Sequence, residues 1–109
     1  MSSSSQVALV GRLGAQVRSK ELPSGDVITS FTVIVDRPVR ERTGGQNAAT
    51  VDAISCTTTR ARARAFVERL EPGTVVSVDG TLRRRFWRGG PGGGVGSTME
   101  VVVRAIRKA

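Results

Sequence analysis

The residues best suited to chemistry lie in residues 80–94, which read GTLRRRFWRGGPGGG. Three consecutive arginines lead to Phe86 and then to Trp87, the only tryptophan of the chain. An arginine guanidinium matches the geometry of phosphate and also stacks on bases, and an indole ring is a platform on which a base can stack. The segment therefore suggests a binding site for single-stranded nucleic acid. The alternative is that Trp87 is partly buried and has a structural role.

Strand periodicity decides which of these side chains act together. Residues 74–87 are rich in β-branched residues and predict a strand. Period two places Arg83, Arg85 and Trp87 on its polar face, whereas Phe86 falls on the apolar face and points with the interior or its rim. A bulge at the central glycine of this strand would change the register upstream but keep the three polar-face residues together.

Arginines elsewhere are further candidates for phosphate contacts, each with a solvated surface side chain as the alternative. One lies on the polar face of the first predicted strand, and two open a predicted helix. Others lie in or next to residues 38–49, a long polar loop, and such loops are often functional when they have no regular structure of their own. The expected nucleic-acid contacts are Arg12, Arg37, Arg40, Arg42, Arg60, Arg62, Arg83, Arg85, Trp87 and Arg88.

The composition favours a polyanionic partner and argues against catalysis. The 109 residues, enough for one domain with a modest core, carry a net charge of +8. A GC-rich coding sequence would explain the preference for arginine over lysine, but not the surplus of positive charge, which points to nucleic acid. Because histidine and a phosphate-binding loop motif are absent and there is one cysteine, we expect no enzymatic activity, no metal site and no cofactor.

The hydropathy pattern predicts no association with membranes. No apolar run approaches the roughly 18 residues of a membrane span, and the N-terminus lacks the features of a secretory signal. Cys56 is the only cysteine, which excludes an internal disulfide and fits a reducing compartment. We expect it to be a small packed residue rather than a reactive one.

Alternation of apolar and polar residues predicts strands along most of the chain. Gly11 and Gly14 in the first strand suggest a bend or a bulge. A turn at residues 22–26 joins the first two strands, and a flexible glycine-rich loop at residues 88–96 joins the last two. The predicted strands are residues 6–18, 27–37, 50–59, 74–87 and 97–108.

The period changes in residues 60–73, which read RARARAFVERLEPG. Apolar residues at i, i+3, i+4 and i+7 form one stripe of a short helix, which begins after a capping Thr58 or Thr59 and ends before Pro72. The alternation in RARARA indicates a strand as the alternative, but alanine and arginine are good helix formers. The stripe consists of Ala63, Phe66, Val67 and Leu70.

The order of the predicted elements, β-β-β-α-β-β, indicates an all-β fold with one short helix. This order, with early glycines in a long first strand, suits the OB-fold, a five-stranded Greek-key β-barrel capped by a helix. We expect residues 1–5 to be a disordered tail and residues 6–109 to form a single OB-fold domain.

Four stretches match a known family: VALVGRLG, LPSGDVITSFTVIVDR, FVERLEPGTVVSVDGTLRRRFW and TMEVVVRAI. Through them almost the whole chain resembles the bacterial single-stranded DNA-binding protein family. The resemblance implies an OB-fold that binds single-stranded DNA non-specifically in replication, recombination or repair, in the cytoplasm at the nucleoid. It also implies a homo-oligomer, with a tetramer favoured and a dimer as the alternative, and contacts with replication or repair proteins.

Most of the base-stacking aromatics that this family usually carries are replaced in this chain. Val39 or Arg40 stands at one such position, Ala53 and Thr59 stand at two others, and only Trp87 is retained. The chain also ends in AIRKA rather than in an acidic, apolar tip, which suggests a short divergent paralogue or a truncated OB domain. We therefore expect weaker and more electrostatic DNA binding than is usual in the family, with a nearly complete loss at high salt.

Two alternatives stay open at this point. The missing aromatics and acidic tip favour an oligomeric OB-fold accessory or scaffold module that contacts a protein partner and has weak affinity for nucleic acid. The net charge opposes this alternative. RNA is an alternative ligand, because a stacking platform does not read the 2′-hydroxyl.

Overall fold

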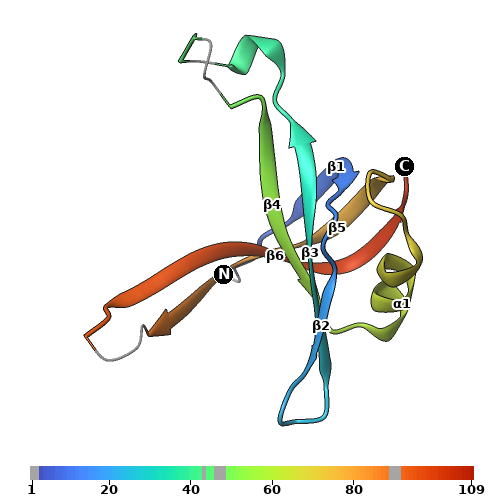
Figure 1. The fold of residues 1–109 in the computed structure, drawn as a ribbon, viewed down its shortest axis with the longest axis vertical. Coiled ribbons are helices and arrows are strands. Elements are labelled where there is room, and N and C mark those ends of the chain that lie inside the picture. The colour runs from blue at the N-terminus through green and yellow to red at the C-terminus, as the bar shows by residue number, and fades with distance from the viewer. Residues whose placement is uncertain (1–2, 43, 46–48, 89–91) are drawn as a thin grey trace.

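The computed structural model describes residues 3–42, 44–45, 49–88 and 92–109, with residue 88 described by its backbone alone (Figure 1). No helix in these ranges is long and apolar enough to span a membrane. The predicted all-β architecture with one short helix is confirmed. Its elements are β1 (Val7–Leu13), β2 (Arg18–Glu21), β3 (Val27–Asp36), the 3₁₀ turn η1 (Val39–Glu41), β4 (Val51–Thr58), α1 (Ala61–Arg69), β5 (Val75–Arg88) and β6 (Val95–Lys108).

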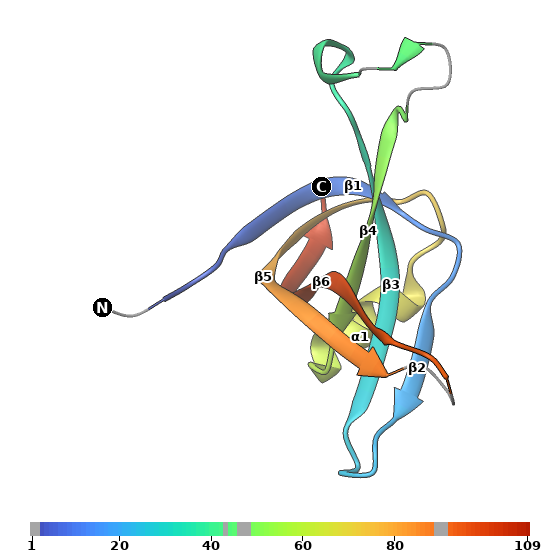
Figure 2. The same cartoon turned by 90° about the vertical axis from the view of Figure 1, so that its left-hand side faces the viewer.

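The strands pair into a closed ring. β1 pairs antiparallel with both β5 and β3, and β3 pairs antiparallel with β4. β4 runs parallel to β6, and β6 returns antiparallel to β5, which completes the ring. Figure 2 shows these strands around the core, with the upper ends of β3 and β4 extending beyond it. The pairing is that of an OB-fold, as predicted.

The predicted first strand, residues 6–18, is divided into β1 and β2. β1 pairs with β5 as far as Arg12, whereas Leu13 pairs with β3 and the Gly14 N–H donates to the carbonyl oxygen of Thr32 at 2.8 Å. The chain bends here to pass from one neighbour to the other, and regular pairing with β3 resumes at Arg18. The described residues therefore hold six strands rather than the five predicted, and the bend lies where the glycines suggested it.

Two glycines allow strands of the ring to approach closely. A Cβ atom at Gly11 would collide with the carbonyl oxygen of Ile34, and one at Gly80 would collide with the carbonyl oxygen of Val102. The register of β5 and β6 also shifts by one residue at Gly80, which leaves Arg104 of β6 unopposed. This β-bulge lies at the glycine where the sequence allowed one, and it increases the local twist of the strand pair.

Helix α1 packs against the ring, and its formation confirms the helical interpretation of residues 60–73. Ala63 and Val67 of its predicted stripe are buried. The predicted threonine cap is wrong: Thr58 Oγ1 accepts the N–H of Arg60, which precedes the helix, and donates to the carbonyl oxygen of Val103. The Thr58 side chain is buried and bonded to β6 of the ring, so it does not cap the first turn of α1. The core consists of Leu13, Phe31, Val33, Cys56, Val67, Val76, Val78, Val101 and Val103.

Beyond the part of β6 that pairs with β4, residues 83–88 of β5 and 95–100 of β6 form a two-stranded arm, most of which projects from the ring (Figure 1). The alternation predicted for β5 continues into the arm, but no core lies beneath its outer part. Phe86 is consequently 66% exposed. The prediction that Phe86 points with the interior or its rim is therefore wrong, because the strand pair has left the ring before this residue.

Candidate nucleic-acid interface

One face of the arm carries the three residues that were predicted to act together. Arg83, Arg85 and Trp87, here called the arm strip, are exposed and lie opposite Glu100, Thr98 and Gly96 of β6, respectively. Directly opposed residues of an antiparallel pair share one face. No ion pair of Arg83 is found within the described residues, and Arg85, whose Nε lies 3.6 Å from Oε1 of Glu100, keeps about half of its side chain exposed. The strip therefore presents an indole and two guanidinium groups to solvent on one side of the arm.

The indole of Trp87 lies against the backbone of Gly96 across the arm. A Cβ atom at Gly96 would be 2.6 Å from Cε2 and Cζ2 of the indole, closer than side chains can approach. The absence of a side chain at Gly96 thus lets the ring lie over the neighbouring strand, while Trp87 stays 48% exposed. One side of the indole is supported by the backbone, and the exposed part is free to contact a ligand.

Replacing Gly96 by valine is expected to displace the indole and to weaken binding of single-stranded oligonucleotides about fivefold or more, through loss of part of a stacking contact. Fluorescence anisotropy of a labelled oligo-dT measures the affinity, and the tryptophan emission of the free protein reports the displaced ring. Gly94→Val is the matched control, because a Cβ atom at Gly94 has no atom of the described residues within 4 Å. Equal losses in the two variants would contradict the supporting role of Gly96.

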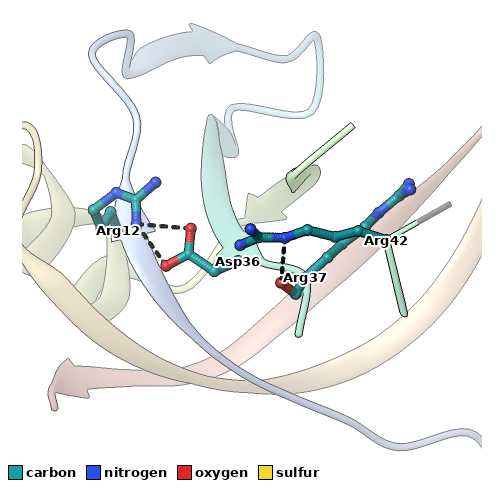
Figure 3. Close-up of polar contacts among 4 residues, drawn as sticks. All are labelled: Arg12, Asp36, Arg37 and Arg42. Atoms are coloured by element: carbon teal, nitrogen blue, oxygen red, sulfur yellow. Dashed lines mark hydrogen bonds and ion pairs between the residues drawn. The ribbon is translucent and has the colours of Figure 1, made fainter. Parts of the chain in front are cut away.

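Two of the predicted phosphate contacts are engaged with aspartates. The Nη1 atom of Arg12 lies 3.1 and 3.0 Å from the two carboxylate oxygens of Asp36 (Figure 3). Arg37 donates from Nε and Nη2 to Oδ1 of Asp52 at 3.0 and 2.7 Å. These hydrogen bonds, and then the charge of Arg37, hold the pKa of Asp52 below its usual value. Both arginines therefore tie neighbouring strands together in the free chain.

The other predicted arginines are spread over the surface. Arg40 lies in η1, and Arg42 follows it and donates from Nε to the carbonyl oxygen of Arg37 at 3.1 Å (Figure 3). Arg60 and Arg62 lie at the start of α1, on the opposite side of the molecule from the tip of the arm (Figure 1). The side chain of Arg88 and residues 89–91 of the predicted loop are outside the described residues, and β6 begins at residue 95 rather than 97.

A polar hollow of about 300 Å³ lies beside the arm strip, and the sequence alone did not indicate it. Arg85, Thr98 and Glu100 of the arm line it together with residues of β2, β3 and β4. Glu100 is almost fully buried although it has an ionisable side chain. Cys56 also lines the hollow; its burial, and then the charge of Glu100, raise the pKa of its thiol to about 12. The thiol is therefore neutral at physiological pH, in line with the expected packing role.

Comparison with known proteins identifies the family. The family model described as "Single-strand binding protein family" matches residues 4–108. The chain belongs to this family. Single-stranded DNA-binding protein 3 of Listeria innocua is 32% identical over 94% of this chain and 61% of its own length. The single-stranded DNA-binding protein of Oceanobacillus iheyensis is 31% identical over 94% of this chain and 61% of its own length.

Among solved structures, this member of the single-strand binding protein family resembles the Plasmodium falciparum SSB in complex with ssDNA. The TM-score is 0.82 at 19% identity, over 100% of this chain and 97% of the other. The likeness supports the OB-fold. The chain spans about 60% of the length of the curated relatives above.

Within this single-strand binding protein domain, the positions of the replaced family aromatics are on the surface. Val39 of η1, Ala53 of β4 and Thr59 after β4 are all exposed. Aromatic side chains at these positions would be available for stacking, but valine, alanine and threonine offer no ring. In the described residues, exposed aromatic rings are found at Phe86 and Trp87, on opposite faces of the arm. The retained stacking capacity is thus concentrated in the arm.

Proposed function

We propose that this chain binds single-stranded DNA without sequence recognition, as a non-enzymatic component of replication, recombination or repair. The observation that carries the proposal is the arm strip, in which exposed Trp87 shares a face with Arg83 and Arg85. Alternate residues of a strand lie about 6.6–6.8 Å apart, a spacing comparable to that of successive phosphates in an extended strand. The indole would stack one base while the guanidinium groups neutralise the neighbouring phosphates.

Electrostatics supplies the remaining attraction. The net charge of +8 gives the chain a positive field that attracts a polyanion, and each neutralised phosphate releases condensed counterions. Because one tryptophan replaces several stacking rings, a large share of the binding free energy is electrostatic. Affinity should therefore fall steeply as the salt concentration rises.

A fluorescence titration tests this function directly, because Trp87 is the only tryptophan and the chain has no tyrosine. Oligo-dT should quench the emission to saturation at low salt, and the quenching should be nearly lost at high salt. A duplex of equal length should compete poorly, since its bases are not free to stack. Absence of quenching by an intact protein would overturn the proposal, as would tight binding that resists salt. Oligo-U in the same titration shows whether RNA is bound as well.

The second candidate function is an oligomeric accessory module that contacts a protein partner and binds nucleic acid weakly. Exposed Val10 on β1 and Val75 on β5 favour it, because they place apolar side chains on the outside of the ring. This module would keep its oligomeric state in light scattering and show no fluorescence response to oligo-dT. A saturating response would exclude it in favour of DNA binding.

We also propose that the chain forms a homo-oligomer, with a tetramer favoured over a dimer, and acts in the bacterial cytoplasm at the nucleoid. The same exposed valines support association. The bacterial relatives, which are named single-stranded DNA-binding proteins, support the location. Light scattering of the purified chain measures the oligomeric state, and a monomer at all concentrations would contradict this part of the proposal.

A further inference from the structure

The polar hollow beside the arm strip differs from the rest of this basic surface because an acidic residue, Glu100, lines it. It holds about 300 Å³, the small end of the range for ligand pockets, which suits a single base rather than a whole nucleotide. Arg85, Thr98 and Glu100 line it from the face of the arm that also carries Trp87. Arg18 of β2, Ser30 of β3 and Ser55 of β4 also line it.

Glu100 is the unusual member of this lining. It is 7% exposed, and glutamates are almost never buried to this extent unless they are paired. Its ion-pair partner among the described residues is Arg85, whose Nε lies 3.6 Å from Oε1. This distance is too long for a hydrogen bond, and a carboxylate has about four acceptor sites. The charge is therefore partly compensated. No hydrogen bond of the carboxylate to another described residue is found, and its oxygens are not shut off from solvent, so they can accept a hydrogen bond from a ligand.

The chemistry of a carboxylate decides which part of a single strand fits there. It repels phosphate and accepts hydrogen bonds without donating any. Cytosine, adenine and guanine each present an exocyclic amino group as a donor, and single strands leave the Watson–Crick edge accessible. Thymine and uracil present carbonyl oxygens on either side of one ring N–H, and these oxygens repel a carboxylate. A buried acceptor beside a stacking platform therefore favours bases that carry an amino group.

We propose that Glu100 is a specificity-determining residue, whose carboxylate accepts a hydrogen bond from the exocyclic amino group of a base held in the hollow. Arg85 and Arg18 at the rim neutralise the adjacent phosphates, and Trp87 stacks a neighbouring base. The chain thus prefers single strands containing amino-bearing bases to strands of uracil or thymine. This inference rests on the proposed binding of single-stranded DNA and adds a base preference to it.

Oligo-dC and oligo-dU of equal length are the matched probes, because both bases are small pyrimidines without a methyl group and differ in the amino group and its adjacent ring nitrogen. Titrations at low salt and mildly alkaline pH, where cytosine is unprotonated, should show oligo-dC binding about fivefold or more tightly. Glu100→Gln keeps the shape but adds an amide donor, which can pair with the uracil oxygen. The ratio of the two affinities should therefore fall to about one in this variant.

Asp79→Asn is the control variant, because Asp79 also forms an ion pair with an arginine of β6, Arg107, at 3.6 Å, but is partly exposed and outside the hollow. It removes the same charge and should keep the wild-type affinity ratio. Equal affinity of the wild type for the two probes would overturn the inference even if Glu100→Gln fails to fold. An unchanged ratio in a folded Glu100→Gln variant would do the same. Failure of both probes and oligo-dT to bind would overturn the proposed function, and the inference with it.

Discussion

Replacement of Trp87 by alanine is expected to weaken oligo-dT binding about 5- to 150-fold, which corresponds to the about 1–3 kcal/mol that a stacked base contributes. The loss should be large because the described surface offers few other exposed rings. Fluorescence anisotropy of a labelled oligonucleotide measures it, since the variant has no tryptophan. Stability should change little, because the indole rests on the exposed arm rather than in the core.

Phe86→Ala provides a closely matched control for this variant. Phe86 is the adjacent residue of β5, is more exposed than Trp87, and lies on the opposite face of the arm. If the strip binds the strand, removal of the phenyl ring should leave the affinity near that of the wild type. Equal losses in the two variants would show that the binding face has been wrongly assigned.

Removal of both arginines of the arm strip, Arg83→Ala with Arg85→Ala, is expected to make the negative slope of log affinity against log salt shallower by about 1.4. This value follows from the loss of two phosphate contacts at about 0.7 each for a single strand. The affinity at low salt should fall in parallel. Titrations at four or more salt concentrations, on this variant and the wild type, measure both quantities.

The control for net charge is the double variant Arg12→Ala with Arg37→Ala, which also lowers the net charge by two. Those guanidinium groups are hydrogen-bonded to Asp36 and Asp52 in the free chain, so contact with phosphate would require them to leave or share these partners. In the strip, no ion pair of Arg83 is found within the described residues, and Arg85 lies 3.6 Å from Glu100, too far for a hydrogen bond. We expect the salt slope of this variant to stay near the wild-type value. A change equal to that of the strip variant would show that net charge, rather than the position of the arginines, governs binding.

Because most of the family's stacking aromatics are replaced in this chain, the effects of the Trp87 and arginine substitutions on DNA binding can be interpreted simply. At the exposed positions of Val39, Ala53 and Thr59 the chain offers no ring on which a base could stack. Binding that depends on the arm can therefore be separated from binding to the remaining surface by one or two substitutions. The outcome will show how little stacking an OB-fold of this family needs when its surface is strongly basic.

Much of the fold could be predicted from local patterns. Period-two alternation located the strands, and a complete stripe with period 3.6 located α1 although RARARA also alternates. The errors lie where tertiary pairing overrides local pattern. The first strand divides because its pairing with β5 ends at Arg12, while its pairing with β3 begins at residues 12–14. Thr58 does not cap α1, because its hydroxyl donates to the carbonyl oxygen of Val103.

The candidate site was predicted in part. Alternation along β5 was enough to group Arg83, Arg85 and Trp87 on one face, because side chains of any strand alternate whatever its surroundings. It could not show that Phe86 is exposed, since exposure depends on whether a core lies beneath the strand. Nor could it distinguish Arg83, for which no ion pair is found in the described part of the chain, from Arg12 and Arg37, whose aspartate partners lie on other strands.

The sequence by itself determined the charge of the surface, the order of the elements and the face on which the tryptophan lies, because composition and side-chain alternation are local properties. Only the tertiary structure decided which arginines are paired, that Gly96 lies beneath the indole, and that Glu100 is buried beside the arm strip. These features depend on the register between strands and on the closure of the ring. They bring together residues far apart in the chain, and no local pattern specifies such contacts.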